Sequence, residues 1–198
     1  MNRRGDGTIR KGDYGMKRQT TRELLAASFQ ELAQTKQINK ITITQITDNC
    51  GMSQPTFYHH FRDKNDLIAW IEAENLNRIL EKNREDESTW KDTLEDLAEY
   101  YIQNRAYILN ALKNTDGPDC FADSMVRLNA EALSGGIQRR SGGEELPAML
   151  GYYIRIYCYG TGKLLEAWLM GEEKLTKEEF TEILWKSVPD PLKPYLGL

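Results

Sequence analysis

The chain has 198 residues, of which 40% are hydrophobic and 28% are charged, as in a globular protein. No apolar run approaches the roughly 20 residues that a membrane-spanning helix needs, and the N-terminus lacks the apolar stretch of a signal peptide. We therefore expect a cytoplasmic protein without a membrane partner. Its cysteines are odd in number and widely spaced, which favours neither a disulfide framework nor a paired zinc motif.

The net charge of −4 is unevenly distributed along the chain. Residues 1–64 contain 11 Lys and Arg against 6 Asp and Glu, whereas residues 65–198 contain 15 against 24. A basic first third on an acidic body favours contact between one end of the protein and a polyanion. Chance remains an alternative, because several of these basic residues belong to an N-terminal arm.

The chain begins with a segment that predicts no regular structure. Residues 1–15 carry four glycines and no apolar periodicity, so we expect a flexible arm there. From Thr20 the pattern becomes helical, and the spacing places several apolar side chains on one face: Leu24, Leu25, Phe29 and Leu32.

Two short helices are predicted next. Thr42 and Gln45 form a capping box that opens a helix through Cys50, and Gly51 is a typical helix stop. Ser53 caps the following helix, with Pro55 in its first turn. Two phenylalanines spaced four apart, Phe57 and Phe61, supply its buried face.

The rest of the chain also predicts helices. Asp63 caps a long helix that runs to about residue 83, and helical patterns follow over 89–103, 105–114, 119–139, 146–170 and 176–187. Gly135-Gly136 and Ser141-Gly142-Gly143 are expected to separate helices, and three prolines close the chain. No sustained period-two alternation occurs. The predicted fold is all-α, with a DNA-binding domain over 16–65 and a helical ligand-binding and dimerisation bundle over 66–198.

Two short helices joined by a glycine turn, with a third in front, are typical of a helix-turn-helix. Its second helix must bury one face and offer the other to the major groove. Gln suits adenine edges, a Thr methyl can meet a thymine methyl, and Tyr or His can donate to phosphates. The side chains interleaved with the two phenylalanines are of these types: Gln54, Thr56, Tyr58, His59 and His60. The alternative is a merely solvated face of a small helical subdomain.

Residues 20–70, above all the segment TFYHHFRDKNDL that starts at Thr56, closely resemble the TetR/AcrR family of transcriptional regulators. The resemblance implies a helix-turn-helix that contacts double-stranded DNA. Carried over position by position, the expected contacts fall on Thr44, Gln54, Pro55, Thr56, Tyr58, His60 and Lys64, with His59 at a more variable position. Lys64 is expected to grip a phosphate, and its removal is expected to spare the fold.

The segments YYIQNRAYILNAL and LLEAWLMGE look like the subgroup related to the dihydroxyacetone kinase activator. Tyrosine and tryptophan gather in this half of the chain and suit a small-molecule pocket between helices. The candidate ligand-binding residues are Tyr100, Tyr101, Tyr153, Tyr157 and Trp168, and ordinary core packing is the alternative for each.

We expect a homodimeric regulator, a repressor that an effector releases from a palindromic operator. The alternatives are a regulator or activator controlled by a partner protein, and a helical adaptor without DNA binding. The dimer is expected to form along a stripe of the helix over 146–170 and along Phe180, Ile183 and Leu184. Gly160 and Gly162 suggest a close backbone approach there. The members of the stripe are Leu150, Ile154, Tyr157, Thr161, Leu164, Leu165 and Trp168.

No catalytic or cofactor motif stands out. His59 and His60 are adjacent, so their side chains diverge by about 100° on a helix, and no metal site is expected. Gly160-Thr161-Gly162-Lys163 lacks the first glycine and the final Ser or Thr of a phosphate-binding loop, and no strand precedes it. We expect neither an enzyme nor a cofactor.

Overall fold

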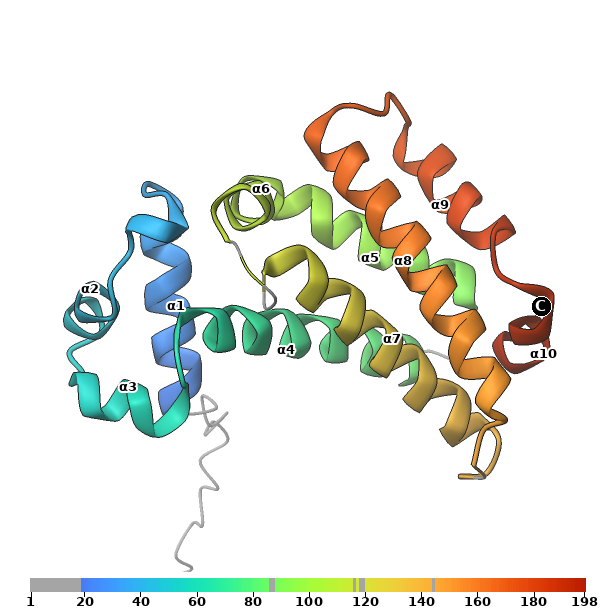
Figure 1. Ribbon diagram of the computed structural model, residues 1–198, viewed down its shortest axis with the longest axis horizontal. Coiled ribbons are helices and arrows are strands. Elements are labelled where there is room, and N and C mark those ends of the chain that lie inside the picture. The colour runs from blue at the N-terminus through green and yellow to red at the C-terminus, as the bar shows by residue number, and fades with distance from the viewer. Residues whose placement is uncertain (1–18, 86–87, 116, 118–119, 144) are drawn as a thin grey trace, which may run out of the picture.

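The computed structural model describes residues 19–85, 88–115, 117, 120–143 and 145–198. Within these ranges the chain forms α-helices and two short 3-10 helices without a strand, which confirms the all-α prediction (Figure 1). The predicted arm over residues 1–15 lies outside the described residues. The elements are α1 (Thr21–Ala33), η1 (Ile38–Lys40), α2 (Ile43–Asn49), α3 (Gln54–His60), α4 (Lys64–Glu85), α5 (Trp90–Gln103), α6 (Arg105–Asn114), α7 (Phe121–Arg140), α8 (Ala148–Met170), α9 (Lys177–Lys186), η2 (Asp190–Leu192) and α10 (Lys193–Leu196).

Short polar caps set the starts of the first three helices. Thr20 caps α1 through a reciprocal pair of hydrogen bonds with Glu23, and Thr42 caps α2 in the same way. The Ser53 hydroxyl accepts the first free N–H groups of α3. Between α2 and α3, Gly51 adopts a φ of +67°, a left-handed conformation that favours glycine. The geometry of the turn is therefore encoded locally in the sequence.

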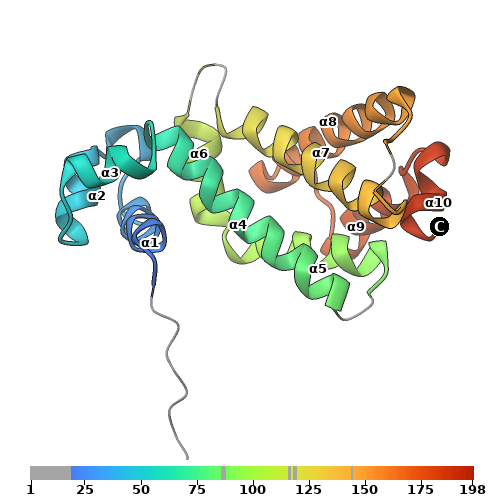
Figure 2. The same cartoon turned by 90° about the horizontal axis from the view of Figure 1, so that it is seen from below.

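The helices lie in two groups joined by α4. In both ribbon views α1, α2 and α3 form one end of the molecule, and α4 runs from them along the C-terminal helices (Figures 1 and 2). There α4 packs against α5 and α7, while α8 packs on α7 and α9 packs on α5. Among the described residues, no helix combines the length and the apolarity needed to cross a membrane.

One buried apolar cluster runs through both groups of helices. It joins Phe29 and Phe57 of the N-terminal helices to Ile68 in α4 and to Ile108 and Phe121 beyond it. The predicted boundary between residues 65 and 66 falls in the first turn of α4, and this cluster crosses it. Two further clusters pack α7 and α8 against the C-terminal segment, and α5 against α9.

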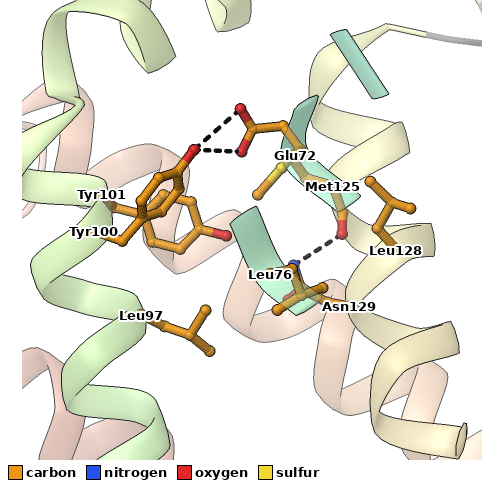
Figure 3. Close-up of a pocket in the computed structure, with 8 residues that line it drawn as sticks. All are labelled: Glu72, Leu76, Leu97, Tyr100, Tyr101, Met125, Leu128 and Asn129. Atoms are coloured by element: carbon orange, nitrogen blue, oxygen red, sulfur yellow. Dashed lines mark hydrogen bonds between the residues drawn. The ribbon is translucent and has the colours of Figure 1, made fainter. Parts of the chain in front are cut away.

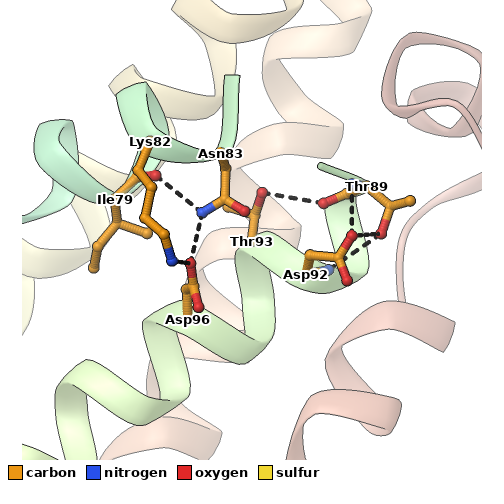
Figure 4. A network of polar contacts seen from close by, with 7 residues as sticks. All are labelled: Ile79, Lys82, Asn83, Thr89, Asp92, Thr93 and Asp96. Atoms are coloured by element: carbon orange, nitrogen blue, oxygen red, sulfur yellow. Dashed lines mark hydrogen bonds and ion pairs between the residues drawn. The ribbon is translucent and has the colours of Figure 1, made fainter. Parts of the chain in front are cut away.

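The far end of α4 is held to α5 by a polar network (Figure 4). The amide of Asn83, itself buried, donates to the Ile79 carbonyl and to the Asp96 carboxylate, both at 3.0 Å. Lys82 pairs with the same carboxylate at 2.8 Å. These hydrogen bonds hold the pKa of Asp96 below its usual value. The network fixes the position of α4 relative to α5 at the end opposite the helix-turn-helix.

The structure corrects two sequence expectations about α8. The stripe expected to form a dimer interface packs inside the chain, because Leu150, Ile154 and Tyr157 are buried against α7 and the C-terminal segment. Phe180 and Leu184 are buried in the same manner against α5. A different face of α8 carries the exposed apolar side chains: Met149, Tyr152, Ile156 and Tyr159.

The glycine and proline expectations also need correction. Gly135 and Gly136 lie inside α7 and do not interrupt it. Gly162 does mark a close approach, but to Val126 of α7 in the same chain: a Cβ at Gly162 would lie 2.8 Å from the Val126 side chain. The proline-rich end forms η2 and α10, whose Leu192 and Leu196 are buried.

Candidate DNA-binding surface and effector cavity

The second helix of the helix-turn-helix, α3, is anchored by its phenylalanines. Phe57 is fully buried and Phe61 is 3% exposed, with their ring centroids 5.7 Å apart. Because these two side chains face inward, the intervening Tyr58 points outward and is 56% exposed. The ring of Tyr58 packs edge-on against Phe57, which orients its hydroxyl away from the core. The helix thus offers a rigid polar face to the solvent.

The fronts of α2 and α3 are tied together by two of the predicted contact residues. The Gln54 side-chain amide donates to the Thr44 hydroxyl at 2.8 Å, and both residues are exposed. Pro55 is exposed beside Gln54. Thr56 is half-buried, because its hydroxyl lies 2.8 Å from that of Ser53 and its N–H donates to the same cap. The structure therefore places Thr44, Gln54 and Pro55 together at one edge.

The two histidines end α3. His59 is exposed and His60 is half-buried, with their ring centroids 5.1 Å apart. The His60 carbonyl accepts a hydrogen bond from Arg22 of α1 at 3.4 Å. Among the described residues, no group of three or more His, Cys, Asp or Glu side chains is placed to hold a metal ion.

Lys64, the last predicted DNA contact, is used inside the domain. Its ammonium donates to the Ile38 carbonyl at 2.8 Å and to the Ile41 carbonyl at 2.6 Å. Partial burial lowers the pKa of Lys64. The expectation that its removal spares the fold does not agree with this geometry, because the side chain links α4 to the segment before α2.

Three adjoining cavities lie between the C-terminal helices. The smallest, about 240 Å³ including its mouth, lies between α4, α5 and α7, and two larger ones of about 580 and 590 Å³ flank α8. Tyr101 and Asn129 line all three. Of the other predicted ligand residues, Tyr100 lines the smallest and Tyr157 one of the larger two.

Two of the predicted ligand residues do not line these cavities. The Trp168 ring stacks on Phe180 at 4.1 Å, and its N–H donates to the Leu175 carbonyl. Tyr153 packs against the cluster between α7, α8 and the C-terminal segment. Both therefore have the packing role that the sequence left open as the alternative.

Comparison with known families gives the fold its context. Residues 24–71 match the family described as "Bacterial regulatory proteins, tetR family", and residues 88–190 match "Transcriptional regulator C-terminal region". The second match alone covers more than half of the chain. The chain belongs to the TetR family of transcriptional regulators. Its helix-turn-helix and helical C-terminal region are those of this family.

Two comparisons point to one subgroup of TetR regulators. The HTH-type dhaKLM operon transcriptional activator DhaS of Lactococcus lactis is 24% identical over 87 residues, which cover 44% of this chain and 46% of the relative. The match thus spans less than half the length of that relative. A solved structure described as "Dihydroxyacetone kinase operon activator DhaS" superposes with a TM-score of 0.59 and 15% identity, covering 84% of this chain and 95% of that one. The chain resembles the DhaS subgroup, as the sequence segments suggested.

Two polar side chains of this TetR regulator were missed by sequence reasoning. Asn110 in α6 donates to the carbonyls of Ala33 and Lys36 and accepts the Ile38 N–H, so it clamps the chain just before α2. Glu72 in α4 is buried beside Tyr100 (Figure 3). Neither belongs to a local motif, and each acquires its surroundings from helices distant in sequence.

Proposed function

We propose that this TetR-family regulator binds operator DNA through the exposed face of α3 and the front of α2. The observation that carries the proposal is the pairing of a fully buried Phe57 with an exposed edge formed by Thr44, Gln54 and Pro55. Gln54 is placed to read a base edge, and the Tyr58 hydroxyl is placed to donate to a phosphate. His59 and His60 extend the same polar face.

We further propose that the regulator acts as a homodimer on a palindromic operator. Two recognition helices related by a two-fold axis enter successive major grooves when they lie about 34–36 Å apart, or a multiple of that distance. The exposed apolar face of α8, rather than its buried stripe, supports this assembly. Met149, Tyr152, Ile156 and Tyr159 recur at intervals of three and four and are each more than half exposed. Beside them Gly160 leaves room for a partner helix, since no atom lies within 4 Å of a Cβ placed there.

The sign of regulation has two candidates. Release of a repressor by an effector in the α4–α8 cavities fits the presence of adjoining spaces next to α4. Activation of transcription is favoured by the likeness to DhaS, which its own description names an activator. Transcription from the bound promoter in cells with and without the gene separates them, because loss of a repressor raises transcription and loss of an activator lowers it.

The DNA-binding proposal is tested with a duplex selected by the protein from a random library. Gln54→Ala is expected to lower affinity for the selected duplex by about 1–3 kcal/mol, with little effect on a random duplex, because a base contact is lost. Tyr58→Phe is expected to weaken both, because a phosphate contact carries no sequence information. Gln138→Ala, at an exposed position in α7, is the matched control. Unchanged binding of both duplexes by both α3 variants would show that another surface contacts DNA.

A further inference from the structure

The smallest cavity contains a buried carboxylate with no cation beside it. Glu72 is 3% exposed, and both of its carboxylate oxygens accept from the Tyr100 hydroxyl, at 3.0 and 3.3 Å (Figure 3). The Asn75 amide donates to that same hydroxyl at 2.8 Å. Within the part of the chain that the structure describes, Glu72 has no Lys, Arg or His partner. A buried carboxylate without a counter-ion is rare, because its desolvation is not offset.

Aromatic and thioether side chains complete the surroundings. Tyr100 and Tyr101 lie with ring centroids 5.3 Å apart, and both line the cavity together with Glu72 and Met125 (Figure 3). The hydroxyl of Tyr107, on α6, is buried and has no hydrogen-bond partner among the described residues. Electron-rich ring faces next to a carboxylate attract organic cations, and a methionine adapts to their shape.

The apolar part of the cavity is suited to the body of a small ligand. Leu76 of α4, Leu97 of α5 and Leu128 of α7 form its remaining walls. Its volume of about 240 Å³ lies just below the roughly 300–1,000 Å³ that is usual for drug-sized ligands. This size excludes a large drug but accommodates a compact ammonium ion, and Tyr101 and Asn129 connect it to the two larger cavities.

We propose that the cavity at Glu72 binds a small organic ammonium ion, with its charge at the carboxylate and its carbon chain against Leu76 and Leu97. This rests on the proposed function, because it names the chemical class of the effector. The position also supplies a route to the DNA-binding end. Glu72 follows directly after Ile71, which with Ile68 packs into the cluster that anchors α3. An ion that draws α4 toward α5 therefore acts on the helix that supports the recognition helix.

The protonation of Glu72 gives the binding a defined pH dependence. Burial raises the pKa of Glu72 to about 7, and the hydrogen bond from Tyr100 opposes this only in part. The titratable groups that face it are phenols, Tyr100 and Tyr101 on α5 and Tyr107 on α6, and burial raises the pKa of each, so they stay neutral near pH 7. The α7 wall contributes no titratable group. A cation must displace the Glu72 proton, so its affinity is expected to rise roughly tenfold between pH 6 and pH 8.

The test compares cations with neutral molecules of the same shape, using the full chain without DNA. The probes are n-butylammonium against 1-butanol, and choline against 3,3-dimethyl-1-butanol, with binding measured by calorimetry at pH 6 and pH 8. We expect at least one cation to bind about tenfold or more tightly than its neutral counterpart, and more tightly at pH 8. Glu72→Gln, which keeps the shape and accepts from Tyr100, is expected to abolish that preference.

Controls separate this proposal from the DNA-binding one. Glu74→Gln removes an exposed charge two residues along the same helix and is expected to leave the preference intact. Equal binding of cation and neutral probe in both pairs, or a preference that survives Glu72→Gln, overturns the ammonium site. Binding of the selected duplex is measured separately without any probe, so failure of the DNA-binding surface leaves the cation result standing, and the reverse also holds.

Discussion

The Lys64 ammonium faces two backbone carbonyls at the base of α4, although its sequence position suggested a phosphate contact. Its hydrogen bonds to the Ile38 and Ile41 carbonyls join three consecutive parts of the helix-turn-helix. A charged donor to a carbonyl contributes more than a neutral one, and partial exposure of the side chain reduces that contribution. Lys64 therefore holds the helix-turn-helix together whether or not DNA is present.

Lys64→Met is expected to lower the free energy of unfolding by about 1–2 kcal/mol, because the two carbonyls lose their donor while the side-chain stem is kept. Urea unfolding followed by circular dichroism measures this. Lys40→Met, at an exposed basic position in η1, is the control and should unfold like the parent. Identical unfolding of both variants and the parent would mean that the Lys64 ammonium does not stabilise the fold.

Glu72 is expected to make stability depend on pH in a direction unusual for a carboxylate. The folded pKa is about 7 and the ordinary value is 4.5, so between these pH values the folded state holds a proton that the unfolded state has released. The free energy of unfolding therefore falls as pH rises through this window, by at most about 3 kcal/mol, and levels off above it. Unfolding curves of the parent and Glu72→Gln between pH 4.5 and pH 8 isolate the effect. Curves that stay parallel would contradict it.

At the scale of whole elements, the contact between α7 and α8 depends on one missing side chain. A Cβ at Gly162 would approach Val126 to 2.8 Å, and a β-branched valine in a helix has little freedom to move aside. Gly136, inside α7, has only the flexible end of Arg139 nearby, at 4.0 Å. The two helical glycines thus differ in their packing and not in their helix propensity.

Gly162→Ala is expected to destabilise the fold by about 1–2 kcal/mol, because the clash outweighs the roughly 1 kcal/mol gained in helix propensity. Gly136→Ala is expected to stabilise it by up to that gain. Thermal unfolding of both variants, and of Gly162→Ala combined with Val126→Ala, tests the cause. If the second substitution does not recover stability, the clash is not with Val126.

The sequence predicts elements better than it predicts their partners. Local signals such as the Thr42–Gln45 capping box and Gly51 predict the helix boundaries because their causes lie within a few residues. The burial of Phe57 follows from spacing alone. By contrast, α8 is apolar on more than one face, and only the packed structure shows that Ile154 faces inward and Ile156 outward. The partners of Lys64 and the setting of Glu72 depend on segments more than 20 residues away, which periodicity cannot reveal.

At the scale of the whole molecule, the exposed face of α8 is large and apolar for a monomer. An obligate dimer interface is expected to bury more than about 2,000 Å² in total. Ile156, 68% exposed, lies in the middle of this face between Tyr152 and Tyr159. Its position makes it the side chain most sensitive to a partner.

Ile156→Glu is expected to convert the dimer to a monomer and to weaken binding of the selected duplex, because two linked recognition helices bind more tightly than one. Sedimentation velocity at micromolar concentration measures the first effect. Ile102→Glu places the same charge at an exposed isoleucine on α5 and should leave the dimer intact. A parent protein that sediments as a monomer would contradict the assembly itself.

The clamp formed by Asn110 and the cluster that joins Phe29 to Ile108 have an evolutionary consequence. A recombination event that exchanged only residues before the start of α4 would separate the helix-turn-helix from the α6 surface on which it rests. The hybrid would inherit a new DNA preference together with a mismatched foundation. We therefore expect operator preference in this lineage to diverge through point substitutions on α3, with the DNA-binding end and α6 inherited as one unit.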